Sequence, residues 1–145
     1  MKVLGLGNPT RGDDAAGARV VRLLQGLGIE ARVLQREPLE LLEVWRPEDD
    51  VVVIDAVLSG APCGTIQTWN RASLALPGPA SASTHSLGLA ETIELARALG
   101  RLPKRLTVFG IEGRQFALGA RMSPEVERAA ADLARSIALR AERAT

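Results

Sequence analysis

Short apolar runs alternate along the chain with longer segments whose apolar residues recur at helical spacing, which predicts strands alternating with helices. The clearest strand is 51–55, where four consecutive β-branched residues, apolar on both faces, predict a central parallel strand that is covered on both sides. Further strands are expected at 3–6, 29–34, 64–69 and 106–111. The connection between 51–55 and 64–69 is too short for a crossover helix, so we expect these two strands to form an antiparallel pair.

Helices are expected at 14–27, at 38–45, from residue 83 or 84 to 99, and from 124 onward. The sequence Ser123-Pro124-Glu125 predicts the start of the last helix, because an N-cap residue, a proline at the first position and an acid near the positive helix end occur together. The residues expected to face inward are Ala16, Val20, Leu23, Leu24 and Leu27 in the first helix, Leu39, Leu42 and Val44 in the second, Leu89, Ile93, Ala96 and Leu99 in the third, and Val126, Ala130, Leu133 and Ile137 in the last.

These elements predict an α/β fold, a three-layer sandwich with helices on both faces of a mostly parallel, twisted, five-stranded sheet that has one antiparallel strand. A chain of 145 residues that is 46% hydrophobic can bury a sizeable core, and we expect one domain over residues 1–145. The stretch 74–83, LALPGPASAS, is too rich in Pro, Gly, Ser and Ala for a regular element and indicates a surface loop.

Composition and charge exclude several classes of function. A formal net charge of +1 and 3% aromatic residues give neither the basic excess nor the stacking platform of a nucleic-acid binder. No apolar run approaches the length of a bilayer span, and the N-terminus lacks the pattern of a signal peptide. The single cysteine, Cys63, excludes an internal disulfide and a cysteine-cluster metal site. We therefore expect a cytoplasmic protein with no nucleic-acid partner and no membrane association.

Candidate chemistry falls at the carboxyl ends of the predicted strands, where α/β sheets gather their sites. The first feature is the glycine-rich turn 5–17, GLGNPTRGDDAAG. It starts like a dinucleotide fingerprint, but Thr10 stands where the third glycine is required. Asp13 and Asp14 at the following helix start would also repel a pyrophosphate. A nucleotide site is therefore not expected. Instead, one of the two acids is expected to cap the helix and the other to face the cleft.

Asp55 and His85 are the other two features. A carboxylate that ends an apolar strand is costly to bury unless it is paired, hydrogen-bonded or metal-bound, although Asp55 could instead cap the loop 56–60. His85 is the only histidine, and by itself it could be a loop residue or a helix cap. Together, Asp14, Asp55 and His85 can supply three ligands to a divalent metal and leave positions open, so we expect them to converge.

The order of motifs along nearly the whole chain resembles the [NiFe]-hydrogenase maturation endopeptidases. In that family a G-x-G-N turn is followed by a pair of acids and a helix, then by a strand ending in Asp-Ala and by a histidine segment. The matching stretches here are 5–8 (GLGN), 13–17 (DDAAG), 53–56 (VIDA), 84–89 (THSLGL) and 122–126 (MSPEV).

This resemblance implies a function and a site. Such enzymes remove a C-terminal peptide from the large subunit of a hydrogenase after nickel has been inserted, and the family's metal ligands correspond to Asp14, Asp55 and His85. The implied cofactor is a divalent metal, nickel carried by the substrate, and the implied partner is a hydrogenase large-subunit precursor or a related metalloprotein. Asp14 or Asp55 could act as base for a metal-activated water. We therefore expect a cytoplasmic metal-dependent endopeptidase whose catalytic residues are Asp14, Asp55 and His85.

One departure from the family and two alternatives remain open. The family's glycine-rich Asp-Gly-Gly-Thr-x-Gly segment corresponds here to 33–38, VLQREP, which has no glycine and leaves the protein substrate and the retention of activity undecided. The same three ligands would serve a non-cleaving module or chaperone that recognises a metal site. The stretch 5–9, GLGNP, is also similar to the start of peptidyl-tRNA hydrolases, but that family needs a histidine where this chain has Asp13, Asp14 and Ala15.

Overall fold

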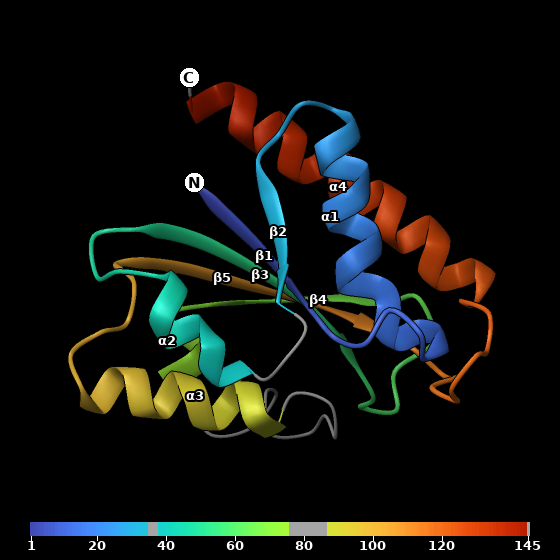
Figure 1. Ribbon diagram of the computed structural model, residues 1–145, viewed down its shortest axis with the longest axis horizontal. Coiled ribbons are helices and arrows are strands. Elements are labelled where there is room, and N and C mark those ends of the chain that lie inside the picture. Colours follow the sequence, from blue (N-terminus) through green and yellow to red (C-terminus); the bar gives the residue numbers. More distant parts are fainter. Residues whose placement is uncertain (35–37, 76–86, 145) are drawn as a thin grey trace.

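The computed structural model describes residues 1–34, 38–75 and 87–144, and within them five strands form one sheet (Figure 1). The strands are β1 (Lys2–Leu6), β2 (Ala31–Leu34), β3 (Asp50–Val57), β4 (Ile66–Asn70) and β5 (Arg105–Glu112). Their order across the sheet is β2-β1-β3-β5-β4, and β4 alone among them runs antiparallel to its neighbour. The predicted fold class, a mostly parallel five-stranded sheet with one antiparallel strand, is confirmed.

The antiparallel strand does not pair where the sequence analysis placed it. β4 runs in the expected direction, but it pairs with β5 and not with β3, with Trp69 opposite Val108. Both edges of β3 are already occupied, by β1 on one side and by all eight residues of β5 on the other. β3 and β4 follow each other in the chain, but in the sheet they are separated by β5, which comes much later in the sequence. The length of the connection between β3 and β4 does not show which strand β4 pairs with.

Helices cover both faces of the sheet (Figure 1). The helical elements are η1 (Gly12–Ala15), α1 (Ala16–Gly26), η2 (Pro38–Glu40), α2 (Leu41–Val44), η3 (Ser73–Ala75), α3 (Leu87–Ala98) and α4 (Pro124–Ala144). Helices α1 and α4 lie together on one face, and α2 and α3 lie on the other. No helix among the described residues combines the length and the apolar character needed to cross a bilayer.

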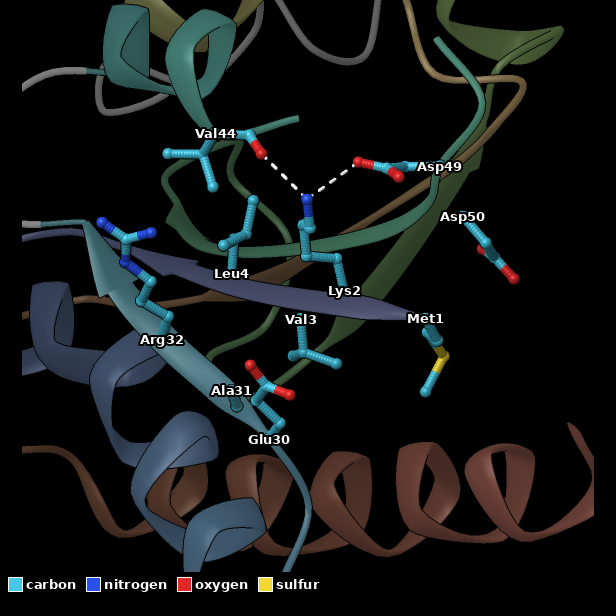
Figure 2. A pocket seen from close by; sticks show the side chains of 10 residues that line it. All are labelled: Met1, Lys2, Val3, Leu4, Glu30, Ala31, Arg32, Val44, Asp49 and Asp50. Atoms are coloured by element: carbon cyan, nitrogen blue, oxygen red, sulfur yellow. Dashed lines mark hydrogen bonds and ion pairs between the residues drawn. The ribbon is translucent and has the colours of Figure 1, made fainter. Parts of the chain in front are cut away.

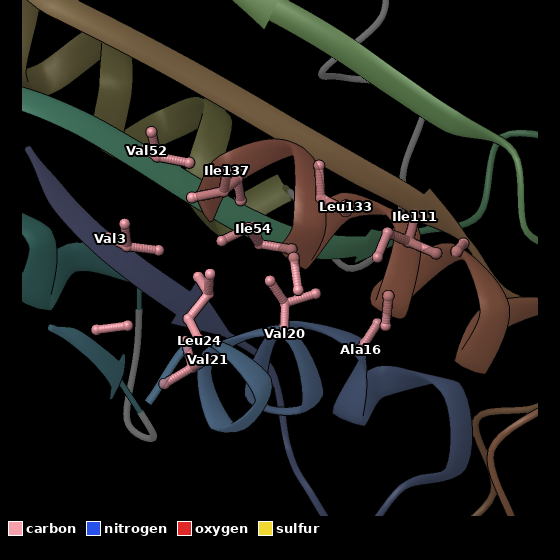
Figure 3. Packing of buried hydrophobic residues seen from close by; sticks show 14 of the residues in the cluster. Val3, Ala16, Val20, Val21, Leu24, Val52, Ile54, Ile111, Leu133 and Ile137 are labelled. Atoms are coloured by element: carbon pink, nitrogen blue, oxygen red, sulfur yellow. The ribbon is translucent and has the colours of Figure 1, made fainter. Parts of the chain in front are cut away.

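Two hydrophobic cores lie on the two faces of the sheet, and β3 contributes to both. Val52 and Ile54 pack with α1 and α4, and Figure 3 shows Ile54 near Val20 and Leu133 and Val52 near Ile137. The intervening residues of β3, such as Val53, pack on the α3 side. Because neighbouring strand residues point to opposite faces, an uninterrupted apolar strand is the expected sequence for this central position. Each fully buried Val, Leu or Ile contributes about 1.5–3 kcal/mol to the stability of such a core.

Most of the predicted inward-facing residues are buried, and the errors gather at helix ends. Leu27 and Leu99 are 59% and 57% exposed. Both lie just past the end of their helix, since α1 ends at Gly26 and α3 at Ala98, so helical spacing does not predict the direction of their side chains. In the short η2–α2 segment the prediction holds in part. Leu42 and Val44 are half-buried and pack against the core, but Leu39 is 48% exposed, and the fully buried residues are Leu41 and Trp45. The predicted cap at Ser83 or Thr84 and most of the loop 74–83 lie outside the described residues.

Candidate active site

The glycine-rich turn after β1 brings two acids to the carboxyl edge of the sheet. The start of α1 packs on the strands without any intervening side chain, since a Cβ on Gly17 would lie 2.5 Å from the Leu6 carbonyl oxygen and 2.7 Å from that of Ile54. Gly7 adopts a φ of +109°, a conformation that L-residues rarely adopt, so the chain can turn directly from β1 into the acidic segment. The turn therefore allows close packing of backbone on backbone.

Asp14 lies in this turn as a buried side chain. Its exposed fraction is 7%, and its Oδ2 accepts a hydrogen bond of 2.9 Å from the backbone N–H of Asn8. Its own N–H donates to the Arg11 carbonyl oxygen at 2.9 Å. The carboxylate is thus fixed at the carboxyl end of β1 by the loop that precedes it.

Asp55 lies on the neighbouring strand but does not end it. β3 continues for two more residues, to Val57, so the expectation that Asp55 is the last strand residue was wrong. Strand alternation places its side chain with those of Val53 and Val57 on the α3 side of the sheet. The side chain is 3% exposed, and its Oδ1 accepts a hydrogen bond of 2.8 Å from the Ala56 N–H.

A small cavity lies beside the Asp55 side chain. Opposite Asp55 on β5 stands Gly110, where a Cβ would come within 2.8 Å of Val57 and 2.9 Å of Trp69. Val57 and Trp69 occupy the place of a side chain there, and the small remaining space beside Asp55 is bounded on the far side by α3, through Leu89 and Ile93. Among the described residues that line it, Asp55 is the only ionisable one and the others are apolar.

Burial and the neighbouring charge of Asp14 together raise the pKa of Asp55 well above its ordinary value, and the Ala56 N–H opposes this only in part. The two carboxylates are therefore close enough to repel each other. A divalent cation between them would replace this repulsion with attraction, which makes the pair a suitable donor set for a metal.

The third predicted ligand, His85, lies outside the described residues. Within 1–34, 38–75 and 87–144 no three His, Cys, Asp or Glu side chains form a metal-binding group. The structure brings Asp14 and Asp55 together, and the complete three-residue cluster stays a prediction. Residues 35–37 of the segment that departs from the family pattern also lie outside the described residues.

Asp13 has a different role from the one expected of it. Neither η1 nor α1 is capped by a side chain, so the prediction that one of the two acids caps the helix was wrong. Asp13 is fully buried, and its carboxylate accepts hydrogen bonds from the N–H groups of Arg114, Gln115 and Ser123 at 2.9, 3.0 and 2.6 Å and from the Ser123 hydroxyl at 2.7 Å. Burial alone would raise the pKa of Asp13, but these donors lower it below its ordinary value. Asp13 thus fastens the loop before α4 to the turn after β1.

A fourth buried acid at this edge, which the sequence pattern did not single out, is Glu112, the last residue of β5. It is 1% exposed and accepts hydrogen bonds from the Ser59 hydroxyl at 2.6 Å, the Ser59 N–H at 2.9 Å and the Gly60 N–H at 3.3 Å. The turn after β3 is therefore held by Glu112 and not capped by Asp55. An acid that ends a strongly apolar strand was the available signal, the same signal that drew attention to Asp55.

A second hollow, of about 260 Å³, lies at the opposite edge of the sheet, around the start of β1 (Figure 2). Within it the Lys2 ammonium donates to the Val44 carbonyl oxygen at 3.0 Å and to Asp49 at 2.9 Å, which binds β1 to the segment after α2. Sites in open parallel sheets form at the carboxyl edge, so the position of this hollow favours a structural role.

Comparison with known proteins gives a consistent result. A family model described as hydrogenase maturation protease, HycI, matches residues 36–140. The hydrogenase 2 maturation protease of Escherichia coli K12 is 30% identical over 132 residues, which cover 86% of this chain and 80% of that protein. The hydrogenase expression/formation protein HupD of Thiocapsa roseopersicina is also 30% identical over 132 residues, but the chain spans only 60% of its length.

Solved structures agree with the sequence comparison. The hydrogenase maturating endopeptidase HybD from Escherichia coli is similar with a TM-score of 0.77 and 28% identity, covering 97% of this chain and 92% of that one. The [NiFe] hydrogenase maturation protease HybD from Thermococcus kodakarensis is similar with a TM-score of 0.73 and 26% identity, covering 97% and 98% of the two chains.

Proposed function

The chain belongs to the hydrogenase maturation protease family, and we propose that it is a metal-dependent endopeptidase that removes a C-terminal peptide from the nickel-loaded large-subunit precursor of a [NiFe]-hydrogenase or a related metalloprotein. The named relatives act in hydrogenase maturation, which supports this class of reaction and of partner. In this proposal the nickel is part of the substrate, and the protein contributes the side chains that bind it.

The observation that carries the proposal is the pair of buried carboxylates, Asp14 and Asp55, at the carboxyl ends of β1 and β3. In the protein alone, burial and the charge of Asp14 favour the protonated form of Asp55. This destabilising arrangement is typical of functional sites and is hard to explain by stability alone. Beside a cation, both groups would be ionised and could act as ligands. His85 is the proposed third ligand.

The proposed chemistry relies on these acids because the other nucleophile candidates are poorly placed. Burial raises the pKa of the Cys63 thiol, which disfavours the reactive thiolate. The Ser59 hydroxyl donates to Glu112, but no histidine among the described residues is available to it as a base. A metal ion at the cleavage site supplies polarisation of the peptide carbonyl or activation of a water. Asp14 or Asp55 is the proposed acceptor of the proton from that water.

The test is incubation of the purified chain with a nickel-loaded precursor, followed by mass spectrometry of the precursor's C-terminus. We expect a shortened precursor with the unmodified chain and at least a hundredfold loss of rate in Asp14→Asn, Asp55→Asn and His85→Ala, in line with the loss of a catalytic group. Asp132→Asn on the exposed surface of α4 is the matched control and should cut normally.

Three results would contradict the proposal. A stable complex in which the precursor stays uncut would instead support a module that recognises the metal site without cleaving. Cleavage of a metal-free precursor at full rate would exclude metal dependence. Full activity of Asp55→Asn would remove the carboxylate pair from the mechanism.

A further inference from the structure

Two exposed arginines lie on neighbouring loops at the same edge of the sheet as the carboxylate pair. Arg11 precedes Asp14 in the turn after β1, and Arg121 lies in the loop before α4. The two loops are in contact, since the Gly119 N–H donates to the Thr10 carbonyl oxygen at 2.7 Å and a Cβ on Gly12 would lie 3.3 Å from the Ala120 side chain. Both arginines are exposed. We call Arg11, Arg121 and Leu118, which lies in the same loop as Arg121, the arginine edge.

These two charges are not balanced within the described part of the chain. Neither Arg11 nor Arg121 forms an ion pair or a side-chain hydrogen bond there. The acids of the same region are already engaged. Asp13 and Glu112 are buried and hydrogen-bonded to backbone N–H groups, and Glu125 accepts two hydrogen bonds from the Arg114 guanidinium, at 2.7 and 3.3 Å. The two guanidinium groups are therefore exposed positive charges beside acids that are already engaged, although the whole chain is nearly neutral at +1.

An apolar side chain accompanies the two charges. Leu118, in the same loop as Arg121, is 69% exposed, more than any other large hydrophobic residue among those described. Arginines beside an exposed apolar residue are typical of a protein interface. A nucleic-acid surface would be expected to add aromatic residues and a broader basic field, and the chain has 3% aromatics.

We propose that the arginine edge is a docking surface for an acidic segment of the protein partner, which it steers toward the site at Asp14 and Asp55. The inference rests on the proposed function for the identity of the partner, and it adds the chemistry of the surface that the partner must present. The loop is well suited to this purpose, because the backbone contact with the turn and the buried carboxylate of Asp13 fix it next to the site.

The test is the double charge reversal Arg11→Glu/Arg121→Glu, with Arg22→Glu on the exposed face of α1 as the matched control. Association with the nickel-loaded precursor is followed by stopped flow at low and at high salt, and cleavage is followed in parallel. We expect the double variant to associate roughly ten- to a hundredfold more slowly at low salt, because steering acts on the encounter, and the difference should shrink at high salt. KM should rise in the same proportion while kcat and the unfolding midpoint stay unchanged.

A second measurement is independent of the enzymatic proposal. A synthetic peptide rich in Asp and Glu should bind the unmodified chain and the Arg22→Glu control at low salt, and should bind the double variant at least tenfold more weakly. A Lys-rich peptide of the same length should not bind. An RNA oligonucleotide that binds in preference to the acidic peptide would overturn the proposal, because it would show that Arg11 and Arg121 bind phosphate groups.

The outcomes separate the two proposals. A precursor that binds with the expected salt dependence but is never shortened rejects the endopeptidase and supports the docking surface. A chain that cuts the precursor, and whose double variant associates at the unmodified rate, rejects the docking surface and supports the endopeptidase. A loss in kcat with unchanged KM would also overturn docking, since the arginines would then act in the chemical step. Failure of the unmodified chain to bind both the precursor and the acidic peptide would reject the docking surface.

Discussion

Asp13 and Asp14 are neighbours in the chain, but their environments give them different roles. Asp13 is surrounded by donors from a loop about 100 residues later in sequence, and these donors favour its ionised form. The charge of Asp14 acts on the buried Asp55 and helps to raise its pKa. At the scale of the residue, one acid stabilises the fold and the other belongs to the candidate site.

Removing the Asp13 carboxylate should therefore destabilise the protein. We expect Asp13→Ala to lower the free energy of unfolding by about 3 kcal/mol, because three backbone N–H groups and a hydroxyl lose their acceptor. Asp132→Ala, on the exposed surface of α4, should change it by less than about 0.5 kcal/mol. Denaturant unfolding measures both, and equal midpoints for the two variants would contradict the role given to Asp13.

The same carboxylate should contribute to pH-dependent stability. Since the folded pKa of Asp13 is lowered, its contribution is present above the ordinary value of 3.8 and is lost as pH falls below 3.8 and through the folded pKa. The difference in unfolding midpoint between the unmodified chain and Asp13→Ala should therefore decrease as pH falls through this range. A difference that is constant with pH would mean that charge plays no part.

The Asp55 carboxylate should have the opposite effect on the pH dependence of stability. Its folded pKa is raised, so as pH rises above 3.8 the unfolded chain releases a proton that the folded chain retains, and stability falls until the folded pKa is passed. Asp55→Asn removes this penalty. We expect the variant to be more stable than the unmodified chain at neutral pH, with a gain that vanishes below pH 3.8, while its cleavage activity is lost. Thermal unfolding across pH measures this, and destabilisation at neutral pH would contradict it.

At the scale of the element, the position of α1 depends on the absence of a side chain at Gly17. A Cβ at Gly17 would meet backbone oxygens of β1 and β3 at 2.5 and 2.7 Å, and backbone atoms cannot move aside as a flexible side chain can. The helix would have to shift away from the sheet, and with it the acidic segment that precedes it.

Gly17→Ala should therefore reduce both stability and activity. We expect a loss of about 2–3 kcal/mol in the free energy of unfolding, the usual cost of overpacking. Gly26→Ala in the same helix is the matched control. It meets nothing within 4 Å, and it should stabilise the protein by about 0.5–1 kcal/mol through helix propensity. If both substitutions stabilised the chain, close packing of α1 on the sheet would be refuted.

At the scale of the whole molecule, the proposed site is open, with ligands contributed by separate elements. Two carboxylates and one imidazole leave positions for a partner's ligands, and they lack the closed four-ligand shell of a structural metal site. Burial and mutual repulsion further weaken the affinity of the two acids for a metal, because Asp55 must release its proton before it can bind.

We therefore expect the purified chain to be free of bound metal after dialysis against a chelator, and to bind nickel weakly until the loaded precursor is present. Titration calorimetry with nickel, zinc and cadmium, with and without the precursor, measures this. Stoichiometric metal that survives the chelator would show that the ion belongs to the protein and not to its substrate.

Much of this molecule was determined by local sequence pattern. The alternation of apolar runs and helical spacing predicted the α/β sandwich, and the run of β-branched residues at 51–54 identified the central strand. The proline after Ser123 marked the start of α4 correctly. Such features are local because burial on one or both faces imposes a period on the sequence itself. The order of motifs likewise identified the family.

Other features were decided by contacts between distant segments. The partner of β4 depends on which strand fills the edge of β3, and the role of Asp13 depends on a loop that returns to it from the far end of the chain. That Asp55 lies within the electrostatic reach of Asp14 follows from the parallel pairing of β1 and β3 and from the close approach of α1. A sequence pattern shows where an acid would be costly to bury, but only the tertiary structure supplies the donors, the neighbouring charge and the apolar wall that decide its state.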